Sequence, residues 1–428
     1  MSRRSPRVRA QRLSVVDEMF LRTHRGFGTP VVMQGLWRGG DIEPSDLVRV
    51  HAALSQGPLS RTVIRPSVPG ARPRWQPGAA PWPIEWAPST VPSDAVVAWA
   101  DTVAARPVDP ESGAGWRLAA ARLDGGGTVL SLVCSHVVAD ARGLATVLAA
   151  AVAGAPAPSE DPPSHRVRDD AADAARMVIG VGARTVRAVA GLVRHPSRRA
   201  ELRSAPVSAG HPDRGDRHSP ATESLITDID ADRWDAEAAR AGGTPNSLLV
   251  AVAVGIAASG APGPRGVGVP VDRRHDPPMP GNAVDMVEVA VRPGDSPAAV
   301  RDLLRAAYTR PPMSSPAGFP PELLQLVPDA VAYRLAPDPG ERDVLCSNIG
   351  AVPAALATIG GARADAVATR AVHPGITADR MAASRNRLSA YLCRLGDRYT
   401  LALVSKDPGL RERAATELAR RGLTGRQW

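Results

Sequence analysis

The stretch VLSLVCSHVVADARG, residues 129–143, decides how the chain folds and where its reactive groups lie. Its apolar beginning predicts a buried strand over 129–135, and the Asp-Gly-Gly-Gly turn before it pairs this strand with another over 117–123. The alanine- and leucine-rich residues 143–152 predict a helix. His136 therefore stands between a buried strand and a helix, where a neutral imidazole can face a cavity.

The residues around His136 leave two interpretations open. It is either a catalytic base or a histidine that caps the end of a strand. The four-residue spacing to Asp140 is weak support for catalysis, because His165 and Asp169 have the same spacing in a polar, proline-rich linker. The buried strand in front of His136 distinguishes it from His165, which has none.

Two other chemistries at this position are disfavoured. Cys134 lies two residues before His136 on the predicted strand, so the two side chains share a face and Cys134 could serve as a nucleophile. Buried free cysteines are usually small hydrophobic residues, however, and we favour that role. His136 and Asp140 have no third candidate ligand nearby in the sequence, so no metal site is predicted.

The remainder of the chain predicts a second block of helices and strands. Strands or helices are expected at 225–230, 232–241, 246–258 and in a hairpin over 387–404. Two alternating blocks joined by linkers predict an α/β (α+β) protein with two lobes.

Composition restricts the class of protein. The chain has 428 residues, of which 44% are hydrophobic and 22% charged, which excludes collagenous, disulfide-rich and mostly disordered proteins. Three cysteines are consistent with a reducing compartment. The longest apolar run, residues 248–258, is well short of the ~20 residues that span a bilayer. We expect a cytoplasmic protein, with peripheral membrane contact as an alternative. The net charge of +9 favours anionic partners, but the sequence has no nucleic-acid-binding motif.

Residues 135–143, SHVVADARG, resemble the HHxxxDG motif of the condensation-domain superfamily. This superfamily includes peptide-synthetase condensation domains, polyketide-associated acyltransferases and the wax ester synthase/diacylglycerol acyltransferases. Further segments resemble motifs of the acyltransferase branches, in the same order: LSVVDEMF (13–20), GTPNS (243–247), VPVDRR (269–274) followed by GN (281–282), and CSNIGAVP (346–353). The basic segment that ends in VRHP (193–196) is similar to the region between the lobes in the wax ester synthase branch.

The resemblance implies two chloramphenicol-acetyltransferase-like lobes, with a tunnel between them and His136 at its middle. The N-terminal lobe would comprise residues 1–165 and carry the HxxxD motif. A basic helix and linker would occupy residues 166–215, and the C-terminal lobe residues 216–428.

The resemblance also implies an acyltransferase. The acyl donor would be acyl-CoA or the phosphopantetheinyl thioester of an acyl carrier protein, and no other cofactor is expected. The acceptor would be a hydroxyl, favoured over an amine, of a lipid or a specialised metabolite. His136 would act as the general base and Asp140 would be structural, paired with Arg274. The remaining residues assigned to the loop or the tunnel are Ser135, Gly143, Asn282, Ser347 and Asn348.

The motif departs from the pattern at two positions. Ser135 replaces its first histidine and Ala141 replaces its glycine, which would be costly if the backbone there had a positive φ. Gly143 could take over such a turn. A second hypothesis follows from these changes: a catalytically degenerate protein that acts as a scaffold for a carrier protein or ligand.

Residues 171–203 form an arginine-rich segment with apolar residues at helical spacing and a local charge of +5. Gly180 and Gly182 weaken the helix prediction. One interpretation is a helix between the lobes whose apolar face packs on the protein and whose arginines are solvated. The other is a contact surface for an anionic membrane or an acidic carrier protein.

Overall fold

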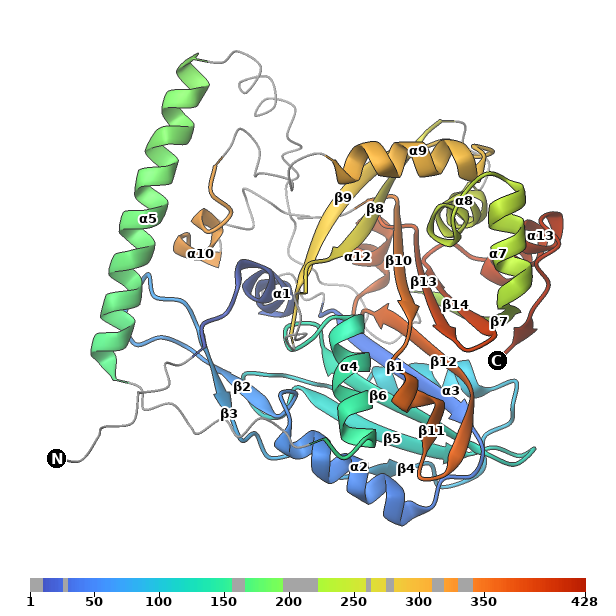
Figure 1. Cartoon of the computed structure of the whole chain (residues 1–428). Coiled ribbons are helices and arrows are strands. Elements are labelled where there is room, and N and C mark those ends of the chain that lie inside the picture. Colours follow the sequence, from blue (N-terminus) through green and yellow to red (C-terminus); the bar gives the residue numbers. More distant parts are fainter. Residues whose placement is uncertain are drawn as a thin grey trace.

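The structure is a computed structural model, and it describes residues 11–25, 30–155, 166–194, 222–258, 263–274, 281–309, 319–329 and 342–428. Two large sheets, each covered by helices, lie side by side, and a long helix stands along one edge of the molecule (Figure 1). The α/β architecture with two lobes predicted from the sequence is confirmed.

The N-terminal lobe is built on a six-stranded sheet with the order β11-β12-β1-β6-β5-β4. Its strands are β1 (Val32–Gly39), β4 (Glu85–Trp86), β5 (Trp116–Arg122), β6 (Thr128–Ser135), β11 (Thr358–Ile359) and β12 (Ala362–Val372). Helices α2 (Pro44–Gln56) and α4 (Ala141–Val152) pack together on one face, and α3 (Val96–Ala104) lies on the other (Figure 1). Every residue of β6 is buried, because β6 lies inside the sheet with helices on both faces.

The C-terminal lobe is built on a seven-stranded sheet with the order β15-β7-β14-β13-β10-β8-β9. Its strands are β7 (Glu223–Asp230), β8 (Arg265–Asp272), β9 (Val284–Val291), β10 (Val344–Ala351), β13 (Leu388–Leu395), β14 (Arg398–Ser405) and β15 (Arg426–Gln427). Helices α7 (Ala231–Arg240), α8 (Pro245–Ala257), α9 (Pro297–Tyr308) and α13 (Leu410–Arg420) accompany it. Ten of the residues of α8 are buried, as its continuous apolar sequence predicts.

A crossover joins the lobes. After β10 the chain passes through the short helix η2 (Ala354–Ala357) into β11 and β12, and β12 pairs antiparallel with β1. The chain then returns through α12 (Ala378–Ala383) to β13 of the other sheet. Residues 358–372 thus complete the sheet of the N-terminal lobe, although the predicted boundaries place them in the range 216–428. Local sequence patterns do not reveal which distant strand a segment will pair with.

A buried polar network also links the lobes. Asp228 of β7 accepts hydrogen bonds from Arg38 Nη2 of β1 (3.0 Å), Thr400 Oγ1 (3.0 Å) and Trp428 Nε1 (2.9 Å). The guanidinium of Arg38 lies over the Trp428 ring, 4.7 Å from its centroid. Burial raises the pKa of Asp228, and these donors oppose that shift.

The basic segment forms α5 (Val167–Arg194), which is continuous through both glycines. Residues 195–203 of the predicted segment lie outside the described residues. The hairpin of β2 (Arg61–Ile64) and β3 (Arg74–Pro77) and the short helix α10 (Leu323–Leu326) lie between α5 and the lobes (Figure 1). Among the described helices, none is both long and apolar enough to cross a bilayer.

The predicted local elements around the motif are confirmed. Strands β5 and β6, helix α4 and the hairpin of β13 and β14 match the predicted ranges to within two residues. These segments are long, apolar and bounded by turn residues, which is where periodicity is most informative.

Candidate active site

His136 follows directly after β6. Its backbone N donates to Val31 O (2.9 Å), which extends the pairing between β6 and β1 by one residue. Its ring stacks on Phe20 of α1 (Val15–Arg25), with the ring centroids 3.7 Å apart and the planes inclined by 15°. His136 as a residue is partly exposed, and the stack on Phe20 holds one face of its ring.

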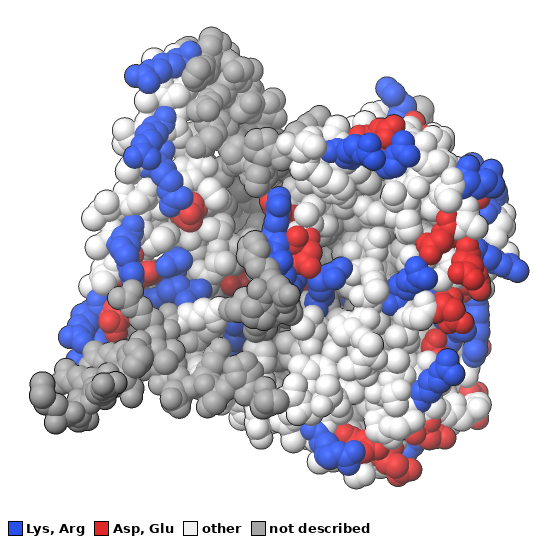
Figure 2. Space-filling model, in the orientation of Figure 1, with Lys and Arg blue, Asp and Glu red and all other residues white. Residues whose placement is uncertain are grey.

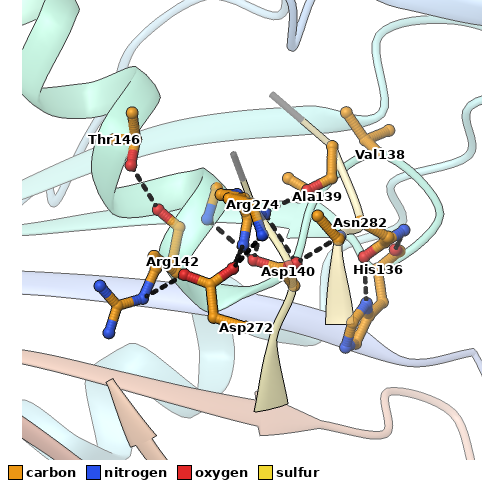
Figure 3. A network of polar contacts seen from close by, with 12 residues as sticks. His136, Val138, Ala139, Asp140, Arg142, Thr146, Asp272, Arg274 and Asn282 are labelled. Atoms are coloured by element: carbon orange, nitrogen blue, oxygen red, sulfur yellow. Dashed lines mark hydrogen bonds and ion pairs between the residues drawn. The ribbon is translucent and has the colours of Figure 1, made fainter. Parts of the chain in front are cut away.

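Asn282 determines the tautomer of His136. Its Nδ2 donates to three acceptors: Asp17 Oδ1 (2.9 Å), His136 O (2.8 Å) and Val137 O (3.2 Å). These acceptors fix the orientation of the amide, so Oδ1 is the atom that faces His136 Nδ1, at 3.2 Å (Figure 3). An amide oxygen can only accept, so Nδ1 carries the proton. The lone pair of the neutral ring is therefore on Nε2.

The electrostatics of the site favour the neutral ring. Burial lowers the pKa of His136 from its ordinary value of 6.5. The contact with its own backbone, the hydrogen bond to Asn282 and the carboxylates of Asp140 and Asp17 oppose this shift without reversing it. At neutral pH the imidazole is thus an uncharged acceptor, as a general base requires.

Asp140 is a structural residue that joins the two lobes. Its carboxylate caps α4 by accepting from Gly143 N (2.8 Å). It also accepts from Ala283 N (3.1 Å) and pairs with Arg274 Nη2 at 2.7 Å, with both side chains buried. The pair expected from the resemblance is present (Figure 3). Because its oxygens are occupied by these donors, Asp140 acts on His136 through the loop and its charge.

The backbone at position 281, directly before Asn282, requires a glycine. Its φ is +103°, and a Cβ there would lie 3.0 Å from Arg61 Nη2. Its carbonyl accepts from Arg274 Nη2 (2.5 Å). The turn of the chain at Gly281 thus brings the amide of Asn282 against the loop that carries His136.

A second interlobe contact lies beside this one. Arg142 at the start of α4 pairs with Asp272 (3.1 Å; Figure 3). It also donates to the carbonyl of Ile349 on β10. Ser347 and Asn348 are partly buried on the same strand, and Asn348 Oδ1 accepts from Gly350 N (2.9 Å). Ser347 and Asn348 thus lie close in sequence to Ile349, which Arg142 contacts, and the hydrogen bond of Asn348 stays within its own strand. Their tunnel role stays a prediction.

The two departures from the motif have simple structural settings. Ala141 is the first residue of α4 and has the right-handed backbone of a helix, so the concern about positive φ does not apply. Gly143 is needed for space, because a Cβ there would lie 2.9 Å from both Arg274 Nη2 and Gly281 O. Ser135 is buried, and its Oγ accepts from Val137 N (3.3 Å).

Cys134, two residues before His136, lies in the interior of the N-terminal lobe. Cys134 is fully buried, and desolvation raises the pKa of its thiol, which makes it a poor nucleophile. Among the described residues, no group of three or more His, Cys, Asp and Glu side chains could hold a metal ion. His165 lies outside the described residues, while Asp169 accepts from Arg166 N (2.9 Å) at the start of α5.

Solved structures share this two-lobed arrangement. The first condensation domain of the CDA synthetase superposes with a TM-score of 0.57 over 96% of each chain, at 18% identity. The chain has the condensation-domain fold. The epimerization domain from the third module of tyrocidine synthetase B shares it, with a TM-score of 0.55 at 13% identity over 98% of this chain and 97% of that one. The starter condensation domain of rhizomide synthetase, solved as a mutant with C8-CoA, also shares the fold. Its TM-score is 0.53 at 15% identity, over 93% of this chain and 89% of that one.

No protein-family model and no curated protein matches the sequence. At these identities the solved structures establish the condensation-domain fold of the chain and nothing finer.

Two residues beside His136 were not predicted from the sequence. Phe20 stacks on the imidazole, and Asp17 accepts from Asn282 while its Oδ2 accepts from Ser14 N (2.9 Å) at the start of α1. The two are three residues apart and so lie on one face of the helix. The signal was present in the segment LSVVDEMF, which was used for resemblance but not for assigning site residues.

Proposed function

We propose that the chain is a thioester-dependent acyltransferase with His136 as its general base. The observation that carries this proposal is the hydrogen bond from His136 Nδ1 to Asn282 Oδ1, which leaves the lone pair on Nε2. The lowered pKa of the ring supports the same role. The condensation-domain fold supports it as well, because condensation domains transfer acyl groups between thioester-bound substrates.

In the proposed reaction, Nε2 of His136 accepts the proton of the acceptor hydroxyl as its oxygen attacks the carbonyl carbon of the thioester. The tetrahedral intermediate collapses with cleavage of the C–S bond, and the imidazolium returns the proton to the thiolate. The products are an ester and a free thiol, with no covalent acyl-enzyme. Such a base contributes about 10²–10⁴-fold in rate, and holding both substrates together supplies a further large term.

The surrounding residues serve this step by position and charge. Asn282 Oδ1 keeps accepting from Nδ1–H when the ring becomes an imidazolium, and Asp17 and Asp140 stabilise the positive charge. Phe20 holds the ring plane. The donor is an acyl-CoA or a carrier-bound thioester, and a hydroxyl acceptor is favoured over an amine. The similar rhizomide synthetase domain was solved with C8-CoA, which makes medium-chain acyl-CoA a good first donor to test.

The experiment measures release of free thiol from acyl-CoAs of increasing chain length, with mixed alcohols and amines present. Acceptor-dependent release is expected in the wild type and in His51→Ala, a control on α2 whose ring bonds to Trp82 O (2.7 Å). In His136→Ala we expect a loss of about 10²–10⁴-fold. Release that survives in His136→Ala would overturn the proposed base. If neither acyl-CoA nor carrier-bound donors release thiol, the non-catalytic scaffold becomes the better hypothesis.

A further inference from the structure

Helix α5 is held against the body through one face only. Asp170 and Asp173 on that face are buried: Asp170 accepts from Ser67 N (2.7 Å) and pairs with Arg12 (2.7 Å), and Asp173 pairs with Arg72 (2.9 Å). Further along, the inward face continues through buried Ala174, Met177, Val181, Ala188 and Gly191. These contacts fix which side of α5 faces outward.

The outward side carries a second apolar stripe. Its large members are between 47% and 71% exposed: Val178, Ile179, Val186, Val189 and Val193. At 3.6 residues per turn they fall, together with exposed Ala175 and Gly182, in a sector about 100° wide that lies away from Met177 and Val181. No polar residue occupies this sector from Ala175 to Val193. The stripe is about 27 Å long, at 1.5 Å per residue.

Arginines border this outward stripe. Arg176, Arg187 and Arg194 are exposed and follow one edge of the stripe at helical spacing. From Ala174 to Arg194 the helix contains four arginines and no acidic residue. Figure 2 shows basic side chains spaced along this edge of the molecule with uncharged surface between them, and acidic side chains beside the middle and lower ones. The charge of the surface therefore complements an anionic partner.

We propose that the outward face of α5 binds an anionic lipid surface. Interfacial helices of this kind combine an apolar face with arginines beside it, whose stems remain in the apolar layer while the guanidinium groups reach the headgroups. The stripe is purely aliphatic and has neither the aromatic anchors nor the hydrogen-bonding groups that protein interfaces use. A bilayer requires neither. Small Val and Ala side chains bury little area, so binding depends on anionic lipid.

The test is flotation of the full chain with vesicles of phosphatidylcholine alone and of phosphatidylcholine mixed equally with phosphatidylglycerol. We expect the protein to float only with the anionic vesicles, and less at high salt. The double variant Ile179→Asp, Val186→Asp should stay at the bottom. Arg187→Gln should lower the partition constant about fivefold, the equivalent of the ~1 kcal/mol that one arginine contributes near such a surface.

The control is Val48→Asp on α2, which replaces an exposed valine far from α5 along the chain with aspartate and so adds one of the two charges of the double variant. It should float like the wild type. Arg187→Gln changes an exposed side chain only, so it remains informative if the double variant fails to fold. The proposal is overturned if the wild type does not float with anionic vesicles, or if the α5 variants float as the wild type does.

Discussion

Replacing Asn282 with leucine is expected to weaken the preference of His136 for the tautomer that is protonated on Nδ1. In the wild type the hydrogen bond from Nδ1–H to Asn282 Oδ1 is 3.2 Å long and favours the ring that has its lone pair on Nε2. A net hydrogen bond is worth about 1 kcal/mol, so its loss should reduce the preference for this tautomer about fivefold. Leucine keeps the branched shape of the side chain but offers no acceptor.

The same substitution separates positioning from general damage through the pH profile. The hydrogen bond to Asn282 opposes the lowering of the pKa of His136, so without it the pKa falls further. We therefore expect a kcat that is lower by at most about fivefold, together with an acidic limb that moves to lower pH. Damage to the fold alone would reduce the rate without moving the limb in this direction.

The direct assay is the ¹⁵N chemical shift of the histidine ring nitrogens, which identifies the protonated nitrogen and requires no activity. The chain has nine histidines, and the signals of His136 are assigned by their absence in His136→Ala. Asn246→Leu is the control, because this amide donates to the Tyr308 hydroxyl (3.0 Å), outside the His136 site. A wild-type ring protonated on Nε2, or an Asn282→Leu protein with unchanged ring shifts, would refute the assignment.

Three further predictions follow from other contacts. For acyl transfer by the wild type, kcat/KM should fall to half of its maximum at a pH below 6.5, because burial lowers the pKa of His136 and the neutral ring is the base. An acidic limb with its midpoint above pH 6.5 would contradict this. Asp140→Ala removes one of the two carboxylates that pair with the buried Arg274 guanidinium, the other being that of Asp272 (3.1 Å), and should lower the free energy of unfolding by about 1–3 kcal/mol in urea titrations. The double variant Asp140→Ala, Arg274→Met should cost less than the sum of the two single changes. Trp428→Phe removes one donor from the buried Asp228 and should cost about 1–3 kcal/mol of stability with the ¹⁵N shifts of His136 unchanged; altered shifts would show that the two networks are coupled.

The elements around His136 were predictable because each depends on its own sequence. Strand β6 is mostly apolar and is buried at every position, and α4 begins with Asp140 as its cap. The position of β12 was not predictable in this way. Its pairing with β1 joins residues more than 300 positions apart, and an apolar segment can pair with any strand of compatible register.

The interpretation of α5 shows a second limit of periodicity. The apolar residues of this segment recur at helical spacing, which predicts one buried face. In the structure Met177 and Val181 are buried, whereas Val186, Val189 and Val193 face outward. Helical spacing alone could not separate the two stripes, because the choice of buried face depends on Asp170 and Asp173 and their distant partners.

The site itself explains why HxxxD spacing is weak on its own. The ring of His136 is stacked by α1 and oriented by the chain between β8 and β9, while Asp140 contributes chiefly by fixing the loop between them. A histidine without Asp17 or Asn282 would have the spacing but no defined tautomer. The informative signature is thus the motif together with the aspartate of LSVVDEMF and the Gly-Asn pair at 281–282. The orientation of this imidazole depends on three segments that only the packing of the two lobes brings together.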